Sequence, residues 1–175
     1  MKAIYSTLIL IFALAVSACS TTQTSDIKVQ SNKDPKANFA GYNTYAWAGY
    51  AAILNDPDKS WVAPGFDINA EIKHLIDTEL RAKGMTEKAN KPDVVIGYAL
   101  GVDMANMDYK KNPEQSFETL QNTPRGGLVL MMVDPETGFA IWASVATAEV
   151  QGQPNDVAKK RLEYTVKTML ESLPK

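Results

Sequence analysis

Residues 127–150 read GLVLMMVDPETGFAIWASVATAEV, and they constrain the fold more than any other segment of the chain. Two apolar runs, residues 126–133 and 139–150, flank the polar turn Asp134-Pro135-Glu136-Thr137-Gly138. Proline early in the turn fixes a backbone angle, and glycine late in the turn readily adopts the left-handed conformation. That order is typical of a β-hairpin built on a type I turn followed by a bulge. The segment therefore predicts two adjacent antiparallel strands.

Three further segments have the composition of strands. Residues 94–102 (VVIGYALGV) are apolar almost without interruption, which is typical of a strand in the middle of a sheet. Residues 42–47 (YNTYAW) are rich in the aromatic and β-branched side chains that strands favour. Ile27 and Val29 alternate with polar neighbours and indicate a weaker first strand. Together with the hairpin, these segments predict a mostly antiparallel sheet of about five strands.

One amphipathic helix is predicted between Asp67 and Gly84. Asp67 is suited to cap its start, and the apolar residues recur on one helical face: Ile68, Ile72, Leu75, Ile76 and Leu80. His74, the only histidine of the chain, falls on the other side of this helix. We therefore expect His74 to be exposed to solvent.

A second amphipathic helix is predicted from Asn155 or Asp156 to Ser172, where Pro174 stops it. Two amphipathic helices need a shared apolar surface, and one face of the sheet offers it. The expected fold is α+β, a two-layer sandwich with both helices packed on one face of the sheet.

The chain begins with the features of an export signal. Lys2 precedes an apolar run at residues 8–16, which is too short for the roughly 20 residues needed to span a bilayer. The sequence Val16-Ser17-Ala18-Cys19 resembles a lipobox, where bacteria attach lipid to the cysteine and remove the preceding peptide. We expect a signal peptide at 1–18, a lipidated tether at 19–25 and a folded domain at 26–175. The alternative is an ordinary secretory signal cleaved after Ala18, which would give a soluble periplasmic protein.

Cys19 is the only cysteine, so it has no disulfide partner within the chain, and its place at the cleavage point favours a modified residue. In the lipoproteins that this segment resembles, an aspartate after the cysteine retains the protein in the inner membrane. Ser20 stands at that position here. The resemblance implies an outer-membrane protein that is anchored by acyl chains such as palmitate and faces the periplasm.

The composition argues against several classes of function. The formal net charge of −2 provides no basic surface for nucleic acid. One histidine and one cysteine cannot build a multi-histidine or multi-cysteine metal site. The sequence has no Gly-x-Ser-x-Gly elbow, phosphate-binding loop or dinucleotide fingerprint. We therefore expect no metal, no cofactor and no enzymatic activity.

Two long segments are the candidate binding regions. Residues 49–66 contain two prolines and two aspartates, which break regular structure. They include Trp61, whose large side chain either covers the core or contacts a ligand or partner. Residues 103–125 are polar with scattered methionines and aromatics, and residues 114–121 have the pattern of one or two helical turns. Trp47, Trp61 and Tyr98 are the candidate walls of a binding pocket.

The ordered set of segments resembles the DUF4136 lipoprotein family. The resemblance spans residues 26–174 and rests on the 42–47 strand, Ile76-Asp77, Lys83-Gly84, Pro92-Asp93-Val94 and the 127–142 hairpin. It implies an envelope lipoprotein of unknown molecular role and supplies no catalytic residues. We expect a non-enzymatic binding or assembly module with an envelope partner. A small-ligand or lipid-binding module is the alternative, and an envelope hydrolase is the third possibility.

Overall fold

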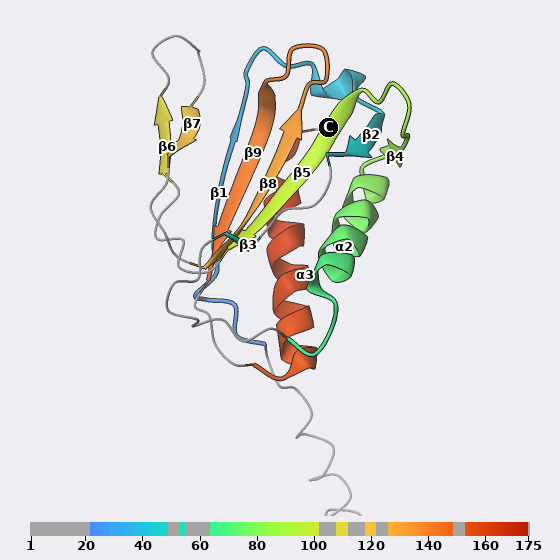
Figure 1. Cartoon of the computed structure of the whole chain (residues 1–175). Helices are drawn as coiled ribbons and strands as arrows, with labels where there is room; N and C mark the ends of the chain where they lie inside the picture. Colours follow the sequence, from blue (N-terminus) through green and yellow to red (C-terminus); the bar gives the residue numbers. More distant parts are fainter. Residues whose placement is uncertain are drawn as a thin grey trace, which may run out of the picture.

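The computed structural model of the chain describes residues 22–48, 53–54, 64–101, 108–111, 118–121, 126–148 and 153–174. It shows one layer of strands and one layer of two helices (Figure 1). The helices are α2 (Ile68–Ala82) and α3 (Asn155–Glu171), and a short 3-10 helix, η2, spans Phe39–Gly41. The strands are β1 (Lys28–Lys33), β2 (Thr44–Trp47), β3 (Ile53–Leu54), β4 (Thr86–Glu87), β5 (Val94–Gly101), β6 (Asp108–Lys111), β7 (Glu118–Gln121), β8 (Gly127–Val133) and β9 (Ala140–Thr147).

The main sheet has the strand order β1-β9-β8-β5-β2-β4, and the two-residue β3 pairs with β5 beside this path. The α+β class is confirmed, but the expected number of about five strands is wrong because the path has six. The pairs β1–β9, β9–β8 and β8–β5 are antiparallel, whereas β2 is parallel to β5 and to β4. The parallel part arises because α2 carries the chain back between β2 and β5.

The central hairpin forms as its turn chemistry predicts. The Gly138 amide donates to the Asp134 carbonyl at 2.8 Å, and Gly138 has φ +70°. The Asp134 carboxylate accepts from the Glu136 amide at 2.8 Å, which fixes the first part of the turn. The register of β8 and β9 shifts at Met132/Val133. The expected turn with an adjoining irregularity is therefore confirmed.

Alternate residues of the central strands face the helices. Val94, Ile96 and Tyr98 of β5 join every second residue of β8 in the core, together with Trp142 and Ala146 of β9, and α2 adds Ile72, Ile76 and Leu80. On the opposite face Val129 and Val145 are also buried. The strand period of two and the helical period of 3.6 thus bring the apolar residues together between the two layers.

Both helices begin at the same end of the molecule and run in the same direction (Figure 1). Asp67 caps α2 by accepting from the amides of Asn69 and Ala70 at 3.0 and 3.1 Å. Gly84 ends the helix with φ +83°, as expected of a glycine after the last turn. His74 is exposed, which confirms its predicted side of the helix.

One local prediction is wrong. Residues 118–121 do not belong to a helical turn; they form β7, which pairs antiparallel with β6 in a separate two-stranded sheet. The scattered apolar residues of this region have no clear period of two or 3.6, so their spacing does not distinguish a helix from a strand. The remaining residues of 103–125 lie outside the described part of the chain, as do the signal peptide, Cys19 and most of 49–66.

Candidate functional site

Two of the three proposed pocket aromatics lie together in the structure. The rings of Trp47 and Tyr98 meet edge to face, with centroids 6.0 Å apart and an interplanar angle of 89°. Parallel pairing of β2 with β5 explains this, because it places both side chains on the helix-covered face. Trp61, the third candidate, lies outside the described residues.

The polar atoms of these aromatics are already occupied by α2. The Trp47 Nε1 donates to Asp77 at 3.1 Å, and the Tyr98 hydroxyl bonds to Asn69 at 3.0 Å. The Lys73 ammonium lies 4.9 Å from the centre of the Trp47 ring. These contacts fasten α2 to the sheet, so in this structure the pair has a packing role.

Asp77 is the centre of that polar cluster. It accepts from the Tyr45 hydroxyl at 2.6 Å and from the Lys73 ammonium at 2.7 Å, in addition to Trp47. Burial alone would raise its pKa, but the hydrogen bonds from Lys73, Tyr45 and Trp47 together outweigh burial and lower it below 3.8. The carboxylate is therefore held in its charged, accepting form at neutral pH.

A pocket of about 180 Å³ lies at a different place, at the end of the molecule where both helices finish. Its apolar walls come from four elements far apart in sequence: η2 and its following residue, the chain after α2, strand β8 and the chain after α3. The residues that shape it are Phe39, Tyr42, Lys83, Met85, Met132 and Leu173. Trp47 and Tyr98 do not line it.

The edge of this pocket carries polar groups. The Lys83 ammonium donates to the Leu173 carbonyl at 3.1 Å, which ties the end of α2 to the end of α3. The rings of Phe39 and Tyr42 meet edge to face at 5.9 Å. Burial, followed by the negative charges of Asp134 and Asp34, raises the pKa of the Tyr42 hydroxyl. Tyr42 therefore keeps its proton and can donate a hydrogen bond to a ligand.

Sequence reasoning missed this pocket. Tyr42 is predicted only as the first residue of the 42–47 strand, and Lys83 contributes only to the family resemblance. The one available signal was the pair of aromatic residues next to the 3-10 turn, three positions apart. Nothing in the sequence indicates that the chain after α3 closes the pocket from the other side, because that contact depends on how the helix packs.

At the opposite end, the first described residues are fastened to α3. The Arg161 guanidinium makes two hydrogen bonds to the Asp26 carboxylate, at 2.9 and 2.6 Å, and also donates to the Gln23 carbonyl. The Arg161 and Asp26 side chains are 12% and 13% exposed, so solvent screens their attraction only weakly. We call this arrangement of Arg161, Asp26 and Gln23 the N-terminal clamp.

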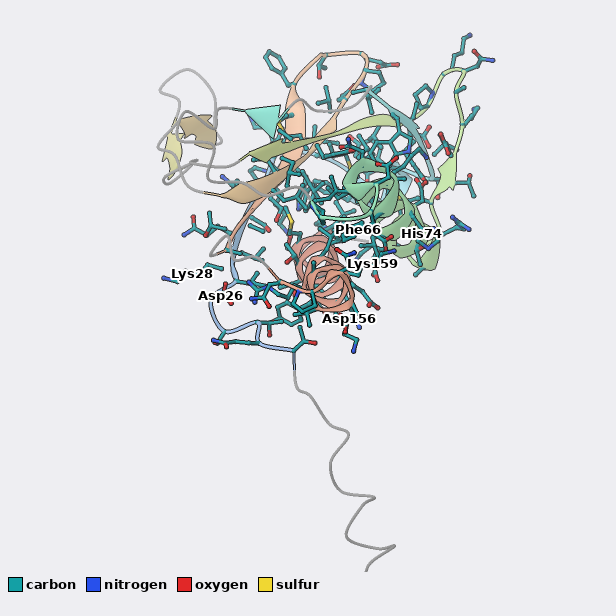
Figure 2. All side chains as sticks on the ribbon, turned by 60° about the horizontal axis from the view of Figure 1, so that its bottom comes forward. Asp26, Lys28, Phe66, His74, Asp156 and Lys159 are labelled. Atoms are coloured by element: carbon teal, nitrogen blue, oxygen red, sulfur yellow. The ribbon has the colours of Figure 1, made fainter. Side chains whose placement is uncertain are left out.

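The same end carries a second set of ties between the helices (Figure 2). Lys159 pairs with Glu71 at 2.7 Å and lies 4.9 Å from the ring centre of Phe66. Asn155 accepts from the Gly65 amide at 3.0 Å, so it supports the entry to α2. These contacts hold the starts of α2 and α3 side by side.

The described residues contain no group of three or more histidine, cysteine or acidic side chains arranged to hold a metal ion. Within that same part of the chain, neither helix combines the length and the hydropathy that crossing a membrane requires.

Comparisons with known proteins agree with this fold. A family model described as "Domain of unknown function (DUF4136)" matches residues 29–175. The structure is similar to that of a DUF4136 family protein from Bacteroides thetaiotaomicron, with a TM-score of 0.60, 13% identity and coverage of 84% of this chain and 95% of that one. It is also similar to PelC from Paraburkholderia phytofirmans, solved as a dodecamer, with a TM-score of 0.51, 14% identity and coverage of 85% and 99%. No curated protein matches the sequence.

Proposed function

We propose a function from the residues of this chain, since the DUF4136 family to which it belongs consists of domains of unknown function. The proposal is a lipid-anchored envelope protein whose domain binds a partner without catalysing a reaction. The observation that carries the binding role is the pocket between η2 and the end of α3. It combines apolar walls with a few polar groups at the edge, which is the general character of binding sites in proteins.

The size of the pocket favours a side chain of a partner over a whole small molecule. Pockets for drug-sized ligands usually enclose about 300–1,000 Å³, whereas a cavity of about 150 Å³ admits one benzene. A pocket of about 180 Å³ therefore has room for a single aromatic or branched apolar side chain. Tyr42 and Lys83 at its edge can donate hydrogen bonds to carbonyl groups next to that side chain.

The anchoring role rests on Cys19 and the export segment before it. Lipid on Cys19 would place the domain on the outer membrane, facing the periplasm. An unmodified cysteine would leave the protein soluble in the periplasm. Two acyl chains are enough for stable anchoring, at about 0.8 kcal/mol per buried methylene. Mass spectrometry of the amino-terminal peptide decides between the two, and Cys19→Ala is expected to abolish processing and sedimentation with vesicles.

The binding role is tested by photo-crosslinking in intact cells. A photoreactive amino acid at Tyr42 should capture a defined envelope partner, whereas the same probe at the exposed His74 should not. Adding Ala40→Trp, which puts a large ring at the pocket edge, should abolish capture, and Ala70→Trp on exposed α2 should not. Equal capture from both probe positions, or capture that survives Ala40→Trp, would exclude this pocket as the binding site.

Self-association and small-ligand binding are separate outcomes of the same experiment. A crosslinked product of this chain with itself would indicate an assembly of identical copies, as in the dodecamer that the PelC structure represents. A small molecule that remains bound in native mass spectrometry, and is lost with Ala40→Trp, would support the ligand-binding alternative. Turnover of an envelope substrate that also survives Cys19→Ala would support the hydrolase and contradict the non-enzymatic proposal.

A further inference from the structure

We propose that the N-terminal clamp holds the end of the domain where both helices begin against the lipid surface, so that the pocket points away from the membrane. The inference rests on the proposed lipid at Cys19 and adds to it a fixed orientation. Its physical basis is the number of residues between the anchor and the first fastened residue, together with the place of that residue in the fold.

The clamp shortens the reach of the tether. Gln23 is the fourth residue after Cys19, and a fully extended chain spans at most about 3.6 Å per residue. Gln23 therefore lies within about 14 Å of the lipidated residue. Without the clamp, the first residue fixed by the sheet is Lys28, and the same arithmetic allows about 32 Å.

The shorter reach leaves little space beneath the domain. The headgroup region of one leaflet is about 5–7 Å thick, from the difference between the whole bilayer and its hydrocarbon core. The tether of a clamped domain thus reaches only about 7–9 Å beyond the headgroups, whereas the tether of an unclamped domain could reach about 25–27 Å beyond them. Because the clamp fastens Asp26 to the second turn of α3, the end of the molecule that contains it must face the membrane.

That end is the one labelled by Asp26, Phe66, Asp156 and Lys159 in Figure 2. The pocket lies at the other end of α3, beside Leu173. The 17 residues of α3 span about 25 Å at the helical rise of about 1.5 Å per residue. Leu173 follows Arg161 by twelve residues, so the clamp places the pocket on the order of 18 Å farther from the lipid than Arg161.

The charges at this end indicate which lipid surface it meets. Lys28 and Lys159 lie near Asp26 and Asp156, so both signs are present and neither dominates. Anionic lipids attract clusters of about four to eight lysines or arginines. Two of the cations at this end are already paired with carboxylates, Lys159 with Glu71 and Arg161 with Asp26. The covalent reach of the tether, and not charge, would then keep the domain near zwitterionic headgroups. The orientation should persist in high salt and without anionic lipid.

The test uses the full mature chain, with lipid on Cys19 confirmed by mass spectrometry, in phosphatidylcholine vesicles. If cells do not modify Cys19, a maleimide lipid is attached to this single thiol, so the orientation is measured whether or not the anchoring proposal holds. A fluorescent amino acid replaces Asp156 near the clamp or Ala40 near the pocket. Nitroxide on the lipid headgroup then quenches fluorescence at short range only.

We expect the probe at 156 to lose most of its fluorescence and the probe at 40 to keep most of it. Arg161→Ala should restore much of the signal at 156, and so should about six Gly and Ser residues inserted after Ser20, which lengthen the tether by roughly 13 Å. Lys160→Ala, which removes an exposed neighbouring cation, should change nothing. Asp26→Ala serves as a second clamp variant if Arg161→Ala does not fold.

Three results would overturn the inference. Equal quenching at positions 156 and 40 would show that the domain has no preferred end towards the lipid. Unchanged quenching in a folded clamp variant would show that the clamp does not set the distance. Quenching at 156 that requires phosphatidylglycerol, or disappears in high salt, would show that charge and not tether length brings this end to the membrane.

Discussion

Asp77 shows how one carboxylate can connect two layers of a small domain. Tyr45 and Trp47 are two positions apart in β2, so their side chains share a face and their polar atoms reach the same oxygen of Asp77. Lys73, one helical turn before Asp77, satisfies the other oxygen. The charged form of Asp77 therefore holds α2 to the edge of the sheet.

We expect Asp77→Asn to lower the free energy of unfolding by about 1–3 kcal/mol at pH 7, because an amide nitrogen cannot accept from Lys73. The pKa of Asp77 is lower in the folded chain than its ordinary value of 3.8. The stabilisation is thus complete above that value and is lost as pH falls through the folded pKa. The difference between variant and native protein should shrink below pH 3.8.

Urea unfolding at a series of pH values measures this difference. Glu163→Gln is the matched control, since Glu163 is exposed on α3, and its effect should stay within about 0.5 kcal/mol. A deficit for Asp77→Asn that stays constant down to the lowest pH would show that lost packing, and not lost charge, causes it.

At the scale of elements, the β8–β9 hairpin depends on the backbone conformation of one glycine. Gly138 has φ +70°, and a side-chain Cβ built there would meet nothing within 4 Å. The penalty of Gly138→Ala is therefore conformational and should be about 1–2 kcal/mol. Equilibrium unfolding in urea measures it.

Gly97→Ala in β5 is the contrasting variant. Gly97 does not have a positive φ, and its added Cβ would lie 3.6 Å from the Ala48 Cβ, an ordinary contact. Alanine also restricts the unfolded chain more than glycine does, so this variant should be neutral or stabilising by up to about 1 kcal/mol. Equal destabilisation by the two substitutions would contradict the conformational explanation.

The sequence predicts elements where local chemistry determines them. The apolar period of α2 with Asp67 at its start, and the turn residues at 134–138, specify their conformations without help from distant parts of the chain. β4 escaped prediction because two exposed residues, Thr86 and Glu87, carry no pattern. Their strand conformation comes from pairing with β2, which only the assembled sheet provides.

The candidate sites depend on the whole molecule, and most of them could not be read from the sequence. The sequence predicts that Trp47 and Tyr98 lie in strands, but only the parallel pairing of β2 with β5 brings the two rings together. The pocket needs η2 and the chain end after α3 to meet across more than a hundred residues. Periodicity shows which face of an element is buried and does not show which other element covers it.

Leu173 joins stability to the pocket at the scale of the whole fold, because it closes the core after the last turn of α3. Its side chain is 3% exposed, and its carbonyl accepts from Lys83. Leu173→Ala should lower the free energy of unfolding by about 2 kcal/mol, the lower end for a buried leucine, because the enlarged pocket can admit water. The melting temperature should fall by about 4–8 °C.

The control is Tyr164→Ala on the same helix, where the side chain is 44% exposed and the expected change is below about 0.5 kcal/mol. If the pocket takes a partner's side chain, Leu173→Ala should also weaken crosslinking from Tyr42 at a temperature where the variant is still folded. Undiminished crosslinking in that folded variant would mean that the Leu173 wall does not contact the partner, although it stabilises the domain. Melting curves and crosslinking yields from the same preparations separate these two roles, because only the second depends on the partner.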